Sequence, residues 1–185
     1  MAVGSPRNVQ ELVSLYYESL YRYAYRLSGS AADADDLTQE SFCKAQTQFK
    51  TLRDPERAKS WLFSICRNLY LHRLRSERQR PTVPLDAVSE LPEDLPDELP
   101  AVDSQKLQAA LDELPELFRT PLILFYFEEF SYRDIAEQMD LPIGTVMSRL
   151  ARAKAGLRQR LYPEMFPDSH AAGHNAEVGR ATDGL

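Results

Sequence analysis

Residues 81–103 divide the chain, because they hold five of its 12 prolines and seven acidic side chains without one basic side chain. Proline lacks a backbone N–H donor, and neighbouring carboxylates repel one another. Such a segment is expected to stay extended and mobile instead of joining a packed core. The sequence therefore predicts two small domains joined by a flexible, acidic, proline-rich linker.

The sequence on both sides of this segment carries apolar residues at helical spacing, without a competing strand pattern. Before the linker, the spacing predicts helices over residues 8–28, 33–49 and 57–78, with a loop around Pro55. The predicted fold class is all-α. The predicted parts are domains at 8–80 and 104–162, the linker at 81–103 and a disordered tail at 163–185.

Prolines and capping residues predict where the helices after the linker begin and end. Ser104 can cap a helix that runs to about Leu114, and Pro115 suits the first turn of the next helix. Pro121 lies inside the apolar run that follows. An interior proline costs about 3 kcal/mol, so a kink or a restart of the helix is expected there.

The segment from Ser131 to Leu161 changes the sign of its charge at one turn. Acids are mixed with apolar residues up to Asp140, and every charged residue from Leu141 onward is basic. In a helix-turn-helix, the first helix packs across the second, and only the second enters the major groove. One helix facing protein and one facing phosphate would explain the change of sign. A basic helix alone is more often a solvated surface. The residues that accompany it therefore decide whether it is interpreted as a DNA-binding helix.

That pattern favours a helix-turn-helix. Ser131 and Asp134 have the spacing of a capping box. Small Ala136 would let the two helices approach closely, and Val146 and Leu150 would face inward from the second helix. Two turn positions lack the glycine that takes positive φ most easily. Asp140 tolerates that conformation, and Glu129 is expected to extend a helix. The outward-facing side chains of the second helix include Thr145, Ser148, Arg149 and Arg152.

Composition narrows the classes of function. The net charge is −6, but residues 1–80 carry 13 basic and nine acidic side chains, so the acidic average hides a basic domain.

No apolar run reaches the roughly 18 residues of a membrane span, and a cytoplasmic protein is expected. Cys43 and Cys66 are expected to be buried thiols. Without a metal cluster, nucleophile triad or phosphate loop, the sequence predicts no cofactor and no catalysis.

Three stretches resemble one family. "DADDLTQESFCKAQTQF" resembles the polymerase-binding helix of the extracytoplasmic-function (ECF) sigma factors, which belong to the sigma-70 family. "SWLFSICRNLYLHRLRSER" resembles their promoter-melting and minus-ten-reading helix, and "FSYRDIAEQMDLPIGTVMSRLARAKAGLRQRL" their minus-thirty-five-reading module. The likeness implies sigma region 2 at 8–80 and sigma region 4 at 104–162. A helix-turn-helix alone is weak evidence of identity, whereas three motifs in order are strong.

The resemblance assigns a partner to the acidic helix. Acids near a helix N-terminus stabilise it by several tenths of a kcal/mol, which accounts for Asp33 and Asp35 but poorly for Gln39 and Glu40. By resemblance, this face contacts the clamp coiled coil of the largest polymerase subunit. The polymerase-binding residues so predicted are Asp33, Asp36, Gln39 and Glu40.

The resemblance also divides the DNA contacts between the two regions. The loop from Phe49 to Lys59 would capture a flipped non-template base, and the helix after it would contact the minus-ten element. The spacing of Trp61 makes it a core residue. In region 2 the predicted DNA-binding residues are Arg53, Arg57, Lys59, Arg67, Asn68, Arg73 and Arg75. In region 4 they are Thr145, Met147, Ser148, Arg149, Arg152 and Lys154.

The leading hypothesis is a sigma factor that binds core RNA polymerase and directs promoter recognition and DNA opening. The alternative is a stand-alone helix-turn-helix regulator that does not require polymerase. The acidic polymerase-like helix and the wide linker count against the alternative. The predicted partners are core RNA polymerase and promoter DNA, without membrane insertion. Anti-sigma factors commonly regulate this family, so the resemblance adds an anti-sigma factor to the partners.

Overall fold

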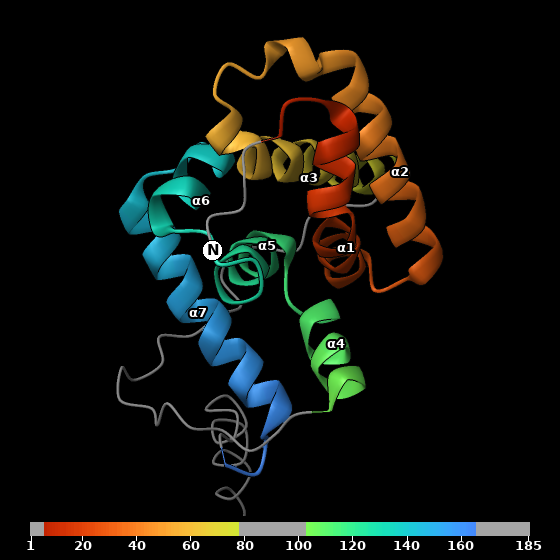
Figure 1. The fold of residues 1–185 in the computed structure, drawn as a ribbon. Coiled ribbons are helices and arrows are strands. Elements are labelled where there is room, and N and C mark those ends of the chain that lie inside the picture. Colours follow the sequence, from red (N-terminus) through yellow and green to blue (C-terminus); the bar gives the residue numbers. More distant parts are fainter. Residues whose placement is uncertain (1–5, 78–102, 166–185) are drawn as a thin grey trace, which may run out of the picture.

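The computed structural model describes residues 6–77 and 103–165, which form seven α-helices and two 3-10 helices (Figure 1). The predicted linker up to residue 102 and the predicted tail from residue 166 lie outside the described residues. Within the described part, every regular element is helical, so the predicted all-α class is confirmed. No described helix is both long and apolar enough to cross a membrane.

Capping residues define the ends of the first two helices. Helix α1 spans Val9–Ser28, and the Asn8 side chain accepts a hydrogen bond from the N–H of Glu11 at 2.9 Å. Gly29 ends α1 in the left-handed conformation, with φ of 71°. Helix α2 spans Ala31–Gln48 and is capped by Ser30.

The third helix follows an irregular loop. The loop contains the short helices η1, Phe49–Thr51, and η2, Pro55–Arg57, where Pro55 occupies the first turn. Helix α3 then spans Ala58–Glu77. The three helices predicted before the linker are therefore present, with ends shifted by at most two residues.

Four helices follow the undescribed segment. Helix α4 spans Ser104–Asp112, α5 Glu116–Tyr126, α6 Tyr132–Met139 and α7 Ile143–Leu161. Asp103 caps α4, whereas Ser104 was expected to do so. The Asp103 carboxylate accepts from the N–H of Gln105 at 3.2 Å, and Ser104 is the first helical residue. Aspartate and serine are both favoured at the cap position. Local propensity therefore does not decide which of these two adjacent residues caps the helix.

Helix α5 bears on two expectations. It runs through Pro121 without a restart, because the proline is the sixth residue and removes only the bond to the carbonyl of Leu117, while a kink at this proline stays a prediction. Leu122 and Ile123, which follow, are completely buried and hold the helix against the core. Glu129 does not extend this helix, because α5 ends at Tyr126 and Glu129 adopts a φ of 59°.

The predicted helix-turn-helix is present as α6 and α7. Ser131 and Asp134 form the capping box in both directions, as their spacing predicted. Asp140 takes the left-handed conformation with φ of 54°, and the N–H of Leu141 donates to the carbonyl of Ala136 at 2.9 Å. The short turn thus has the Schellman geometry, with aspartate in the place of glycine.

One apolar core runs through both halves of the chain. It joins buried residues of α1, α2 and α3 to buried residues of α5, α6 and α7. Helix α5 contacts α1 as well as α6 and α7, and it lies between them in Figure 1. The ring of Phe63 on α3 packs against Phe130, with centroids 5.5 Å apart. The described helices of the two halves therefore pack together.

The two cysteines differ. Cys66 is buried, as expected, and burial raises the pKa of its thiol to about 12. Cys43 is exposed, contrary to expectation. It lies four residues after the exposed Gln39, so it shares the outer face of α2 with that residue.

Candidate DNA and polymerase surfaces

Helix α2 presents the acidic surface that the sequence predicted. The side chains of Ala34, Leu37 and Thr38 are completely buried and fix which face of the helix points inward. The four candidate polymerase contacts are all exposed on the outside: Asp33, Asp36, Gln39 and Glu40. This surface therefore carries negative charge and one amide beyond the first turn, where helix stability alone does not require them.

Arg73 joins this acidic surface to the predicted DNA contacts. Its guanidinium donates to the carboxylate of Glu40 at 2.8 Å, and both side chains remain partly exposed. An exposed ion pair of this kind contributes about 0.2 to 1 kcal/mol, so it can open to other partners at small cost. Arg75, two residues further along α3, is exposed.

A cavity of about 490 Å³ opens between the loop before α3 and helix α6. Arg53 and Asn68 line it, as does Trp61, which is partly buried and packs against the core, where it was expected. The ring of Trp61 meets the ring of Phe49 edge-on at a centroid distance of 6.4 Å. The remaining lining residues are Thr51, Leu52, Asp54, Arg57, Ser60, Ser64, Glu137 and Gln138. Part of the wall of this cavity therefore belongs to the second half of the chain.

Three of the predicted DNA-binding cations are engaged by that second half. Arg57 donates to the carboxylate of Glu137. This bond raises the pKa of the Arg57 guanidinium above its ordinary range. Arg67 donates to the backbone carbonyl of Gln138 at 3.4 Å. No sequence motif indicated these partners, which lie 80 and 71 residues away along the chain.

Lys59 is the third of these cations. It donates to the backbone carbonyl of Glu128 at 2.6 Å, and its ammonium lies 5.1 Å from the ring centroid of Phe130. The Glu128 carboxylate lies 4.0 Å from the same ammonium and is only 4% exposed. Burial raises the pKa of Glu128 to about 7, although the nearby charges of Lys59 and Arg26 act in the opposite direction.

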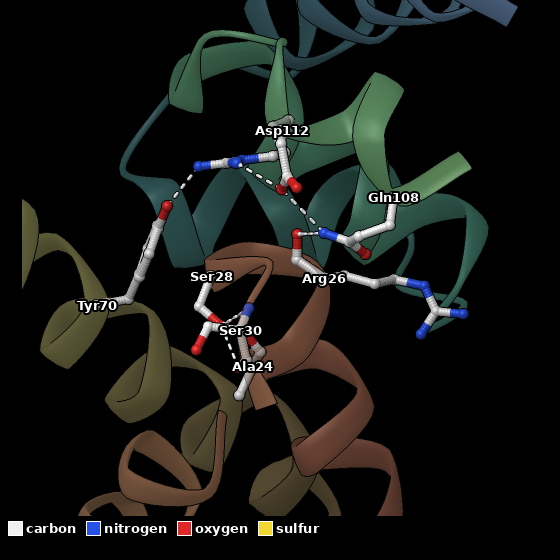
Figure 2. Close-up of polar contacts among 8 residues, drawn as sticks. Ala24, Arg26, Ser28, Ser30, Tyr70, Gln108 and Asp112 are labelled. Atoms are coloured by element: carbon white, nitrogen blue, oxygen red, sulfur yellow. Dashed lines mark hydrogen bonds and ion pairs between the residues drawn. The ribbon is translucent and has the colours of Figure 1, made fainter. Parts of the chain in front are cut away.

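A second contact zone joins the halves on another side (Figure 2). Arg119 on α5 is buried and donates to the hydroxyl of Tyr70 on α3. The amide of Gln108 donates to the backbone carbonyl of Arg26 at 3.3 Å and to Asp112 at 2.9 Å. These residues carry no motif, so the sequence analysis did not single them out.

Gly29 is needed where α4 meets the end of α1. A Cβ at this position would lie 2.7 Å from a carboxylate oxygen of Asp112, which is closer than such atoms approach. The positive φ and the close contact both select glycine here.

Helix α7 presents the second predicted DNA surface. Val146 and Leu150 are buried, and Ala136 lies buried on the facing helix α6, as the helix-turn-helix pattern predicted. Met147 is 51% exposed. The structure places Ser148 and Arg152 on the exposed side, with Thr145, Arg149 and Lys154 partly exposed. The six candidates therefore remain on the accessible part of one helix.

Family models match both halves of the chain. A model described as Sigma-70 region 2 matches residues 12–80, and one described as Sigma-70, region 4 matches residues 104–157. The first contains the α2 surface and the cavity loop, and the second contains α6 and the six candidates of α7.

Curated proteins and solved structures agree with these matches. The chain is 38% identical to the ECF RNA polymerase sigma factor SigE of Mycolicibacterium smegmatis, over 82% of this chain and 60% of SigE. It is 30% identical to the ECF RNA polymerase sigma factor SigW of Bacillus subtilis, over 82% of this chain and 87% of SigW. The match to SigE thus spans less than two thirds of that protein.

Two solved structures share the fold. The sigma factor RpoE of Bartonella quintana, solved in complex with the anti-sigma factor NepR, is 28% identical with a TM-score of 0.67. That comparison covers 82% of this chain and 95% of RpoE. CnrH, solved in complex with the cytosolic domain of CnrY, is 22% identical with a TM-score of 0.58, over 84% of this chain and 88% of CnrH.

Proposed function

The chain belongs to the ECF RNA polymerase sigma factors, and we propose that it binds core RNA polymerase and directs promoter recognition and DNA opening at transcription initiation. The observation that carries the proposal is the order of the two matched regions, each with a charged surface of the kind its role requires. Region 2 would span residues 8–80 and region 4 residues 104–162. An anti-sigma partner is proposed as well, since the similar RpoE was solved with one.

The outer face of α2 is the proposed polymerase contact. Asp36, Gln39 and Glu40 are exposed there on a well-packed helix, so they can meet a partner without rearrangement of the core. Asp33 adds a carboxylate in the first turn. Charged groups on a preorganised surface favour specific encounter with a complementary basic surface.

The cavity between the loop and α3 is the proposed site for a flipped base of the minus-ten element. Aromatic Trp61 offers a stacking surface, and polar Asn68 and Ser64 offer hydrogen bonds to base edges. Arg53 lies at the cavity and can neutralise a phosphate. Extrusion of a base costs a few kcal/mol, which contacts with polymerase would help to offset.

Helix α7 is the proposed reader of the minus-thirty-five element. In a helix-turn-helix, residues near the start of the second helix contact base edges, and basic residues beside them contact phosphates. Ser148 and Arg149 suit the first role, while Arg152 and Lys154 suit the second. Met147 offers an apolar contact and no charge.

Co-elution tests the polymerase contact. Replacement of Gln39 and Glu40 by lysine reverses the charge of an exposed face, so we expect it to abolish co-elution with core RNA polymerase in size exclusion. Circular dichroism should show unchanged helicity, because both residues are exposed and the ion pair of Glu40 with Arg73 contributes only about 0.2 to 1 kcal/mol. The matched control replaces exposed Gln10 and Glu18 of α1 by lysine and should still co-elute. If the α2 variant still co-elutes, or the unchanged chain does not, the proposal is wrong.

A further inference from the structure

Two apolar side chains lie on the exposed surface of α7. Ile143 is 48% exposed and Met147 is 51% exposed, and their spacing of four residues places them on the same face of the helix. The buried face of α7 is formed by other residues, Val146 and Leu150 among them. Single exposed apolar residues are common on proteins, but two neighbours on a helix that would meet DNA are a candidate contact.

Small residues surround Met147 on this surface. Gly144 and Ala151, its neighbours three residues before and four residues after, are exposed, and so is Ser148. A Cβ added at Gly144 would lie in open space. The long, flexible side chain of Met147 therefore extends beyond its neighbours and can reach a surface that the helix approaches.

The charges around the apolar pair are complementary to DNA. Every charged side chain from Leu141 to Leu161 is basic. Arg152 is exposed and Arg149 is partly exposed on the turn that follows Met147. Double-stranded DNA presents its groove edges between two rows of phosphates, so it matches a surface that has apolar groups among cations and no acid.

The major groove offers one kind of apolar group, the C5 methyl of thymine. The other groups at the base edges are hydrogen-bond donors and acceptors. An isoleucine side chain has neither, and a methionine side chain has only a weak acceptor. In a helix-turn-helix, the first residues of the second helix face the base edges. Ile143 is the first residue of α7, and Met147 follows one turn later.

We infer that Ile143 and Met147 form an apolar pair that reads the C5 methyl groups of thymine in the minus-thirty-five element. This inference rests on the proposed function, because it takes α7 as the helix that enters the major groove. The readout is then divided: Arg149 recognises guanine through hydrogen bonds, and the apolar pair recognises thymine through its methyl group. The element contains at least one thymine within reach of the pair, on one strand or the other.

Replacement of thymine by deoxyuridine tests the inference, because it removes the C5 methyl group and keeps every hydrogen-bonding group of the base. The full chain first selects double-stranded DNA at low salt from a library with a randomised central segment. Each thymine of a selected duplex is then replaced singly, and the Kd of the fluorescein-labelled duplex is measured by anisotropy. We expect at least one replacement to raise the Kd about three- to fivefold, the loss that corresponds to one buried methyl group.

Variants of α7 assign this effect to the two side chains. The double variant Ile143→Ala, Met147→Ala should bind the thymine and deoxyuridine duplexes equally well. Met147→Leu keeps an apolar side chain of similar size and should keep the difference between them. Met165→Ala is the matched control, because it removes a methionine that is 61% exposed after the end of α7, and it should behave as the unchanged chain does. Circular dichroism should show the same helicity in all these variants.

Three results would contradict the inference. The unchanged chain selects no thymine, or no deoxyuridine replacement raises its Kd, or the difference persists in the double variant, in which case other residues read the methyl groups. A double variant that loses co-elution with core RNA polymerase but keeps its DNA binding would make the pair a protein contact, and the inference would be wrong.

The DNA measurements do not involve polymerase, so the inference and the proposed function can fail separately. A chain that discriminates thymine from deoxyuridine as expected but never co-elutes with core RNA polymerase would overturn the proposed function and leave the apolar readout standing. A chain that co-elutes but shows no such discrimination would overturn the inference alone.

Discussion

The two candidate DNA surfaces of this protein differ in the contacts that they make within the chain. On region 2, Arg57, Lys59 and Arg67 all donate to atoms of region 4, although the Arg57 side chain stays 52% exposed. On region 4, the candidates on α7 lie on its outer side, and Met147 among them is 51% exposed. Both surfaces are basic helices, so charge alone does not decide whether a surface is available.

The difference arises from the position of α6. One face of this helix, formed by Ile135, Ala136 and Met139, is buried in the core against which α7 packs. Its other face carries Glu137 toward Arg57. The helix that supports the exposed DNA surface is therefore also the helix that covers the other one. Changes that loosen α6 should affect the two surfaces in different ways.

The largest expected effect comes from Phe130, which packs between the halves. Its ring is buried against Phe63 and below the ammonium of Lys59. Phe130→Ala should lower the free energy of unfolding by about 3 to 5 kcal/mol, measured in urea, because it leaves a cavity at this contact. Tyr126→Ala, at a side chain that is 50% exposed, should cost about 1 kcal/mol. Equal losses of unfolding free energy in the two variants would mean that the packing of the two halves does not depend on Phe130.

The next effect is a pH dependence from Glu128. Its pKa is about 7 in the folded protein against an ordinary 4.5, so the free energy of unfolding falls as pH rises from 4.5 and levels off above 7. The interval corresponds to about 3 kcal/mol. Glu128→Gln should match the unchanged chain near pH 4.5 and exceed it by up to that amount at pH 8.

Thermal unfolding of both chains between pH 4.5 and 8 measures this. Glu129→Gln alters the exposed neighbour and should keep the pH dependence of the unchanged chain. Parallel curves for Glu128→Gln and the unchanged chain would show that ionisation of the buried Glu128 carboxylate does not lower the stability of the folded protein.

The exposed surface is tested through Arg149. A bidentate arginine on guanine is worth about 1 to 3 kcal/mol of discrimination, whereas a phosphate contact weakens all sequences alike when removed. Arg149→Ala should therefore flatten base preference within the minus-thirty-five element, and Arg152→Ala should lower the affinity for every sequence and reduce the salt slope by about one unit. Binding to a panel of single-base substitutions at two salt concentrations separates these effects. Uniform weakening by Arg149→Ala would make it a phosphate contact.

The smallest expected effect is at Asp140, the turn that joins the covering helix to the exposed one. Its φ of 54° is a conformation that glycine adopts without strain. Asp140→Gly should change the free energy of unfolding by less than about 1 kcal/mol, because relief of strain and the greater freedom of the unfolded chain oppose each other. Asp140→Val should be clearly destabilising, since a β-branched residue is poorly accommodated at positive φ. Equal effects of glycine and valine would mean that backbone conformation does not limit this turn.

Local patterns in the sequence were sufficient for the helices and for the direction in which many side chains point. The capping box at Ser131 and Asp134 and the inward pair Val146 and Leu150 are present as predicted. The exposed acidic face of α2 follows from the same periodicity. The expected extension of a helix at Glu129 was wrong for a local reason, because a turn begins there, and burial of the residues after Pro121 explains why α5 does not restart at that proline.

Only the tertiary structure decided which surfaces are covered. Arg57 meets Glu137 across 80 residues, and Lys59 meets the carbonyl of Glu128 across 69. Periodicity and capping act over a few residues, so they fix which face of a helix is apolar but not which helix packs against it. The partner depends on how the two halves dock, and the proline-rich acidic stretch between them carries no pattern that sets their relative position.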